Sequence, residues 1–321
     1  MPNFRAILFD LDDTLLVDEA VSYEVLEQVA QQAEEKFKNL FSKSTDAANN
    51  CVAPVLASSG IDYTLSRGAP SAPCSSQASA TLKAGSKIDP KLLVSDAATI
   101  AQELWRAGEC YPFCRSIGIS AFECLWGNFL GDSKDLTALR AWSQRYREEV
   151  FEKALLTQRG DFSELEVAAR SLAQEFSSLR RQQQRLFPKT REVLEQLSSQ
   201  FKLGLLTNGA PDLQREKIAA SGCEDLFSAI VISGEYGVGK PEPAIFERLL
   251  QELGVTSSEA MMVGNNLERD IAGARAAGVT SVWMRLPGER ESEIIHPDFV
   301  ITDLQELLDL ITANCELQTA N

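Results

Sequence analysis

The chain of 321 residues is long enough for a substantial core and, at the usual domain size, for about two domains. With 44% hydrophobic and 24% charged residues, its composition is that of a globular protein, which excludes a fibrous or wholly disordered chain. Acidic residues outnumber basic ones by 46 to 31, and the resulting net charge of -15 opposes binding to nucleic acid or to an anionic membrane surface.

A short apolar run near the start of the chain predicts a strand buried on both faces of a parallel sheet. After Leu186, apolar runs alternate with helical patterns, which is the rhythm of βαβ units in a doubly wound sheet. The predicted strands are 6–9, 203–206, 229–232, 260–263, 279–284 and 299–301, and the predicted helices between them are 188–197, 212–220, 243–253, 267–276 and 304–311.

The segment between these two parts has only helical patterns. Its first helix has one apolar face formed by Val21, Val25, Val29, Ala33 and Phe37, and further helices are predicted at 90–107, 135–155 and 163–185. We therefore expect an α/β core, a Rossmann-like doubly wound parallel sheet, from residues 1–18 and 188–313, and an inserted all-helical cap domain from residues 19–187.

A long stretch inside this insertion, residues 44–87, is rich in Ala, Ser, Pro and Gly and lacks sustained periodicity. This composition predicts a flexible low-complexity segment without a catalytic role.

Cysteine and histidine usage narrows the chemistry further. The seven cysteines are odd in number and irregularly spaced, which favours reduced, structural thiols. The single histidine, His296, precedes Pro297 in a polar loop, so we expect a surface imidazole and no histidine catalysis. No apolar stretch is long enough to cross a bilayer, and we expect a soluble cytoplasmic protein.

Two carboxylates follow the first predicted strand directly. Asp10 and Asp12 are two residues apart on an extended backbone and so project to the same side. Ligands of open α/β sheets bind beyond the carboxyl ends of the strands, where this pair stands. An isolated pair of this kind is more often a solvated acidic turn that caps the next helix.

Three further strand ends carry polar groups. Thr207 and Asn208 supply a hydroxyl and an amide, Lys240 supplies a cation, and Asn265 with Asp270 supplies oxygen ligands. Taken singly, each has an ordinary explanation as a helix start, a solvated lysine or a helix cap. Together with the aspartate pair they indicate a single site.

In this combination the sequence resembles the haloacid dehalogenase (HAD) superfamily, whose four motifs are Asp-x-Asp-x-Thr/Ser, a Thr/Ser, a Lys and an acidic strand end. Asp10, Asp12 and Thr14 match the first of these, and Thr207, Lys240 and the pair Asn265 and Asp270 match the others in order. The insertion falls where this superfamily carries a type-1 cap. The stretches 205–209, 214–218 and 264–271 especially resemble the branch that contains N-acylneuraminate-9-phosphatase.

The resemblance implies a magnesium-dependent phosphatase that forms an aspartyl phosphate on Asp10. Asp12 is then the general acid and base, and Thr207, Asn208 and Lys240 bind the phosphate. The implied Mg²⁺ ligands are Asp10, the backbone carbonyl of Asp12, and Asn265 or Asp270. The implied substrate is a small phosphorylated metabolite, a sugar phosphate or a nucleotide, and the sequence does not indicate an oligomeric state.

One departure from the family pattern leaves an alternative open. Asn265 stands where an aspartate usually binds the metal, so we expect weaker Mg²⁺ binding, and a non-catalytic binding or regulatory protein is the main rival. A phosphate-loop reading of residues 234–241 is less favoured because Pro241 replaces the required hydroxyl. A dehalogenase does not need Asp12, and a phosphonatase would need a cap lysine such as Lys36, Lys38 or Lys43.

Overall fold

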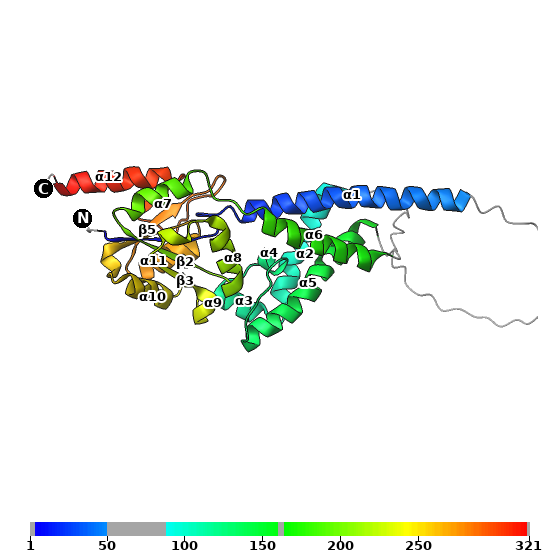
Figure 1. Cartoon of the computed structure of the whole chain (residues 1–321), viewed down its shortest axis with the longest axis horizontal. Coiled ribbons are helices and arrows are strands. Elements are labelled where there is room, and N and C mark those ends of the chain that lie inside the picture. Colours follow the sequence, from blue (N-terminus) through cyan, green and yellow to red (C-terminus); the bar gives the residue numbers. More distant parts are fainter. Residues whose placement is uncertain (1–3, 50–87, 160–163, 320–321) are drawn as a thin grey trace, which may run out of the picture.

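The computed structural model of the chain describes residues 4–49, 88–159 and 164–319. Its centre is one sheet of six parallel strands in the order β3-β2-β1-β4-β5-β6, which confirms the predicted fold class (Figure 1). The strands are β1 (Ala6–Phe9), β2 (Lys202–Thr207), β3 (Ala229–Ile232), β4 (Ala260–Gly264), β5 (Thr280–Met284) and β6 (Phe299–Ile301).

The first strand lies in the middle of the sheet. Phe9 of β1 is in register with Leu205 of β2 on one side and with Val263 of β4 on the other. The chain moves outward from β1 in both directions, so the connections after β1 and β4 diverge at the carboxyl edge of the sheet. This divergence is where open α/β sheets bind ligands.

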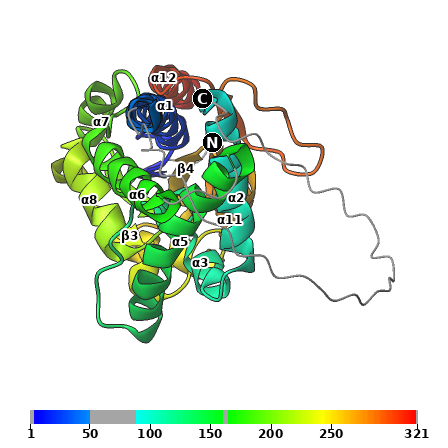
Figure 2. The same cartoon turned by 90° about the vertical axis from the view of Figure 1, so that its right-hand side faces the viewer.

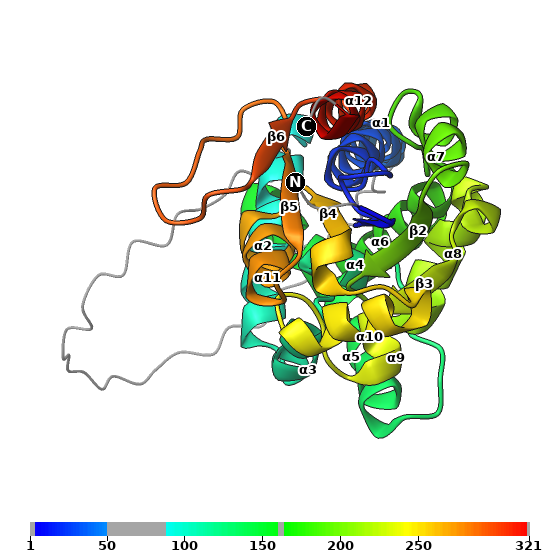
Figure 3. The same ribbon diagram turned by 90° about the vertical axis from the view of Figure 1, so that its left-hand side faces the viewer.

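Both faces of the sheet are covered by helices. Because strand side chains alternate, Ile7 and Phe9 join a core with α7 (Thr190–Ser198) and α12 (Gln305–Thr319), whereas Ala6 and Leu8 join a second core on the opposite face. Figure 3 shows these two helix layers on either side of the strands. The second layer consists of α10 (Pro243–Leu253) and α11 (Ala272–Ala276). Short helical turns at Glu224–Leu226, α9 (Ser233–Tyr236) and Ser257–Glu259 lie in the connections before β3, after β3 and before β4.

A separate hydrophobic core lies among the helices that precede β2 (Figures 1 and 2). The side chains predicted for the apolar face of the first helix, from Val21 to Ala33, are buried there as expected, and Phe37 lies outside the residues whose side chains are described. We call the following six helices the cap: α1 (Glu19–Asn49), α2 (Pro90–Ala107), α3 (Tyr111–Ile117), α4 (Ala121–Cys124), α5 (Lys134–Arg159) and α6 (Leu165–Gln182).

Two details of the cap differ from the prediction. Residues 44–49, expected to be flexible, continue α1 as helix to Asn49, while 50–87 lie outside the described residues. The short helices α3 and α4 were not predicted, because each is too short to show a periodic apolar face. Ser120 starts α4 by accepting the N–H of Glu123, whose carboxylate accepts the N–H of Ser120 in return.

The remaining expectations concern single residue types. His296 is exposed, as predicted, and the cysteines whose side chains are described (Cys110, Cys114, Cys124 and Cys223) are buried free thiols. Among the described helices, none combines the length and the apolar character that crossing a bilayer requires.

Candidate active site

The carboxylate of Asp10 lies at the carboxyl end of the central strand. Lys240 Nζ lies 2.6 Å from Asp10 Oδ1 and 2.7 Å from Asp270 Oδ1. The side chains of Asp10, Lys240 and Asp270 are 11%, 2% and 0% exposed. Because one ammonium contacts both carboxylates, the two acids face the same point. The fold thus brings together three predicted residues that are separated by up to 260 positions in the chain.

Asp270 reaches this point through an unusual turn. The predicted helix 267–276 is divided into a π-helical turn at Leu267–Ile271 and α11, and Asp270 occupies the wider turn. A Cβ atom at Gly264 would lie 2.4 Å from the carboxyl carbon of Asp270. Glycine at the end of β4 therefore permits the carboxylate to approach the strand.

Asn208, which follows β2, holds the loop that carries Lys240. Its amide group donates to the Lys240 carbonyl at 2.9 Å, and its carbonyl oxygen accepts the Lys240 N–H at 2.8 Å. This pair of bonds fixes the lysine backbone opposite Asp10. A direct contact between Asn208 and phosphate stays a prediction.

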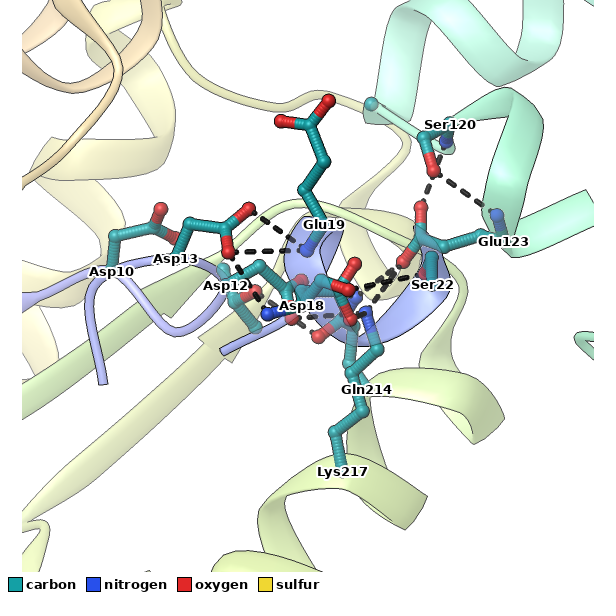
Figure 4. A network of polar contacts seen from close by, with 12 residues as sticks. Asp10, Asp12, Asp13, Asp18, Glu19, Ser22, Ser120, Glu123, Gln214 and Lys217 are labelled. Carbon is teal, nitrogen blue, oxygen red and sulfur yellow. Dashed lines mark hydrogen bonds and ion pairs between the residues drawn. The ribbon is translucent and has the colours of Figure 1, made fainter. Parts of the chain in front are cut away.

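Asp12 is held from helix α8 (Pro211–Ser221). Lys217 Nζ lies 2.9 Å from Asp12 Oδ1, and Gln214 Nε2 donates to Asp12 Oδ2 at 3.2 Å (Figure 4). Thr207 is fully buried and donates its hydroxyl to Gln214 Oε1 at 3.2 Å. Gln214 thus connects Thr207 to Asp12. Phosphate binding by Thr207 stays a prediction.

The residues that directly follow Asp12 and Asn265 act as the helix caps. Asp13 Oδ1 accepts the N–H of Glu19 at 3.1 Å at the start of α1, and Asn266 Oδ1 accepts the N–H of Arg269 at 2.9 Å. Each cap stands one position after a proposed site residue. Asp10, Asp12 and Asn265 are therefore not needed as helix caps.

The oxygen atoms near Asp10 suit a hard cation. Asn265 donates its N–H to Thr14 Oγ1 at 3.0 Å, and its side chain lines the same cavity as Asp10 and Asp270. In the described part of the chain, no group of three or more His, Cys, Asp or Glu side chains is arranged to hold a metal. The candidate donors are two carboxylates completed by neutral oxygens, the Asn265 amide and the Asp12 backbone carbonyl, which is a chemistry that Mg²⁺ accepts.

Burial sets the protonation of the two N-terminal aspartates. It raises the pKa of Asp10 to about 6, with repulsion from Asp270 adding to the rise and Lys240 opposing it. Burial also raises the pKa of Asp12 well above its ordinary value, and the ammonium of Lys217 opposes this rise. At neutral pH, Asp10 is mostly ionised, as a nucleophile must be. The raised pKa of Asp12 favours the protonated form, as a general acid requires.

These residues border a cavity of about 310 Å³ between the strand ends and the cap. Seven acidic side chains line it against two cations, Lys240 and Arg269. This excess of negative charge repels a phosphate ester unless a cation is added. The acidic lining residues are Asp10, Asp12, Asp13, Asp18, Glu19, Glu123 and Asp270.

Sequence reasoning did not single out the polar residues that hold Asp12. Gln214 and Lys217 are three positions apart, so they share one face of α8, and both are fully buried. The sequence pattern of Glu123, three residues after Ser120, indicates only a capping box. Neither pattern shows that the two helices meet at the site.

Comparison with known proteins identifies the family. The model of the haloacid dehalogenase-like hydrolase family matches residues 4–278, so the chain belongs to this family. It is 41% identical over 208 residues to a phosphoserine phosphatase of Thermus thermophilus, covering 64% of this chain and 81% of that protein. It is 37% identical over 148 residues to the N-acylneuraminate-9-phosphatase of Mus musculus, covering 44% of this chain and 60% of that protein.

Solved structures show the same fold. The HAD-hydrolase YfnB from Bacillus subtilis, bound to magnesium, matches with a TM-score of 0.54 at 19% identity and covers 96% of this chain and 98% of its own. The fold class and the enzyme class expected from the sequence, an α/β HAD phosphatase, are confirmed by these matches.

Proposed function

We propose that this protein hydrolyses a small phosphate monoester with Mg²⁺ through a covalent phosphoryl group on Asp10. One observation carries the proposal: Lys240 bridges Asp10 and Asp270 at the carboxyl end of the central strand, beside a cavity that residues of the cap also line. A buried cation beside the nucleophile stabilises the charge that a phosphoryl group develops during transfer.

In the first step, an oxygen of Asp10 attacks phosphorus and forms the aspartyl phosphate, while the bond from phosphorus to the leaving oxygen breaks. Asp12 gives its proton to that oxygen, and the alcohol departs neutral. The raised pKa of Asp12 supports this role.

In the second step, Asp12 takes a proton from a water molecule that attacks the same phosphorus. The bond between phosphorus and Asp10 breaks, and inorganic phosphate and the free carboxylate result. Mg²⁺ held by Asp10, the Asp12 carbonyl, Asn265 and Asp270 would neutralise the phosphoryl oxygens when bound. Lys240 stays beside the reacting carboxylate in both steps.

The phosphorylated amino acid O-phosphoserine is the substrate that we place first, ahead of the sugar phosphates and nucleotides expected from the sequence. The Thermus relative supports this choice. Arg269 supports it too, because it lines the cavity and, within the described chain, its guanidinium donates to the carbonyl of Gly118 at 3.5 Å. A guanidinium there is placed to pair with a substrate carboxylate.

The test is release of inorganic phosphate from a panel of esters with Mg²⁺ and after chelation with EDTA. The panel contains O-phosphoserine, phosphoethanolamine, which lacks the carboxylate, a sugar phosphate and a 5′-nucleotide. We expect hydrolysis that chelation abolishes and excess Mg²⁺ restores, and we expect a lower KM for O-phosphoserine than for phosphoethanolamine. Absence of hydrolysis across the panel would favour the non-catalytic alternative.

The asparagine at position 265 makes a separate prediction. Asn265→Asp adds a negative ligand, so the Mg²⁺ concentration for half-maximal activity should fall by roughly tenfold. Asn266→Asp is the matched control, because it adds the same charge one residue away and keeps the cap of the following turn. An equal shift in both variants would show that only the overall charge matters and that Asn265 does not contact the metal.

A further inference from the structure

The cavity has a second buried polar cluster, on the side away from Lys240. Lys217 of α8 is 1% exposed, and its ammonium lies 2.9 Å from Asp12, 3.0 Å from Asp18 and 3.0 Å from Glu123 (Figure 4). A lysine of this kind is rarely buried unless it is paired, and here three carboxylates surround it. None of the steps proposed above uses Lys217.

The cluster fixes both oxygens of Asp12. Lys217 contacts Oδ1, and Gln214 of the same helix donates to Oδ2 at 3.2 Å. The Asp12 side chain remains 23% exposed and lines the cavity. Lys217 and Gln214 therefore set its orientation from α8, and the carboxyl group stays accessible from the cavity. This is the arrangement that a general acid requires, because proton transfer depends on the direction of the carboxyl group.

The cap contributes one member of the cluster, Glu123. Its Oε2 accepts the N–H of Ser120 at 2.8 Å within the capping box, and its Oε1 contacts Lys217 and Gln214, each at 3.0 Å. The Glu123 side chain is only 5% exposed. The cap therefore contacts Lys217 and Gln214, the two residues of α8 that hold Asp12.

The charges of the cluster are shared. Asp18 also pairs with Arg180 of α6, so two cations face the three carboxylates Asp12, Asp18 and Glu123. The ring of Trp126 lies 4.9 Å from the Arg180 guanidinium and 5.7 Å from the Lys217 ammonium and covers both cations. Loss of Glu123 would leave Lys217 with only two carboxylates and would remove the contact that Glu123 makes with both Lys217 and Gln214.

From these contacts we propose that Lys217 and the cap residue Glu123 are positioning residues for Asp12, so that the acid is aimed at the leaving oxygen only while the cap contact is made. This inference rests on the proposed phosphatase reaction. Glu123 contacts both the ammonium of Lys217 and the amide of Gln214. These contacts hold the two residues in place, and they in turn keep Asp12 extended toward the cavity. When Glu123 is withdrawn, Lys217 and Gln214 lose the contact that holds them, and they no longer fix the direction of the Asp12 carboxyl group.

The experiment compares two leaving groups. An alkyl phosphate such as O-phosphoserine needs a proton from Asp12 to release its alcohol, whereas 4-nitrophenyl phosphate releases a stable phenolate without one. kcat/KM reports the steps up to this release. Glu123→Ala should lower kcat/KM for the alkyl ester by about ten- to a hundredfold and for the nitrophenyl ester by less than about threefold.

Two further variants complete the design. Glu123→Gln removes the charge and leaves one oxygen, which can accept either the Ser120 N–H or a bond from Lys217. It should therefore give a smaller loss than Glu123→Ala with the same preference, and it serves if the alanine variant does not fold. Glu19→Gln is the matched control, because it removes the same charge from the cavity wall outside the cluster. In an Asp12→Asn background, Glu123→Ala should cause no further loss with the alkyl ester.

The outcomes separate this inference from the proposed function. A larger loss with the alkyl ester supports positioning. Equal losses with both esters, or no loss with either, in an active wild type would overturn the positioning role and leave the phosphatase intact. A wild type inactive on every ester would overturn both, because Asp12 would have no leaving oxygen to serve.

Discussion

Replacement of Asp10 by asparagine is expected to lower kcat for phosphate ester hydrolysis by at least about a thousandfold. The amide has no anionic oxygen to attack phosphorus, so the covalent intermediate cannot form. The ion pair of Asp10 with Lys240 is also reduced to a neutral contact. Phosphate release at saturating substrate and Mg²⁺ measures the effect, and acid quenching of the wild type should yield a phosphorylated peptide that contains Asp10.

The matched control is Asp13→Asn. It makes the same chemical change three residues later, and an asparagine there can still accept the N–H groups that Asp13 caps at the start of α1. We expect this variant to keep activity within a few-fold of the wild type. Substantial turnover by Asp10→Asn, or an equal loss in both variants, would remove Asp10 from the role of nucleophile.

Replacement of Lys240 by methionine should affect stability as well as activity. The side chain is 2% exposed and holds two carboxylates, and its removal leaves Asp10 and Asp270 buried, close together and without their cation. Breaking a buried pair in this way costs about 3–5 kcal/mol of unfolding free energy. Denaturant unfolding measures the loss, and activity should fall together with it.

Two comparisons identify the cause of that loss. Lys202→Met removes the same charge at the exposed amino end of β2, where the Lys202 ammonium donates to the Leu253 carbonyl. This variant should cost no more than ~0.5 kcal/mol. Adding Asp270→Asn to Lys240→Met should recover part of the stability, because one of the two repelling charges is gone. A double variant less stable than Lys240→Met would contradict this electrostatic explanation.

The two aspartates of the first motif are held in different ways. Asp10 pairs with Lys240, which also contacts Asp270. Both of these residues come from connections at the carboxyl edge of the sheet. Asp12 depends on α8 and, through Lys217, on Glu123 of the cap. The contacts of Asp10, the proposed nucleophile, thus lie within the α/β part, whereas those of Asp12, the proposed acid, also depend on the cap.

Much of the fold followed from the sequence because local patterns report local structure. The apolar run 6–9 and the later strands appear where period and composition predicted them. The order of the strands within the sheet was not predicted and comes from the structure. The short helices α3 and α4 were missed because a few residues show no period. The break at Ile271 within a predicted helix was missed because burial of Asp270, a tertiary effect, selects the wider turn.

The sequence alone determined which groups we propose for the reaction: Asp10 after the first strand, Lys240 and Asp270 after later ones, and asparagine at 265 in place of an acid. Only the tertiary structure decided which side chains hold Asp12. Gln214 and Lys217 share the buried face of α8 with Leu213 and Ile218. The sequence of the helix does not reveal whether the residues that cover this face are apolar or charged. The charges on it are stable only because Asp12, Asp18 and Glu123, from distant segments, meet there. Spacing within one helix carries no information about such a meeting, since it depends on how the cap packs against the core.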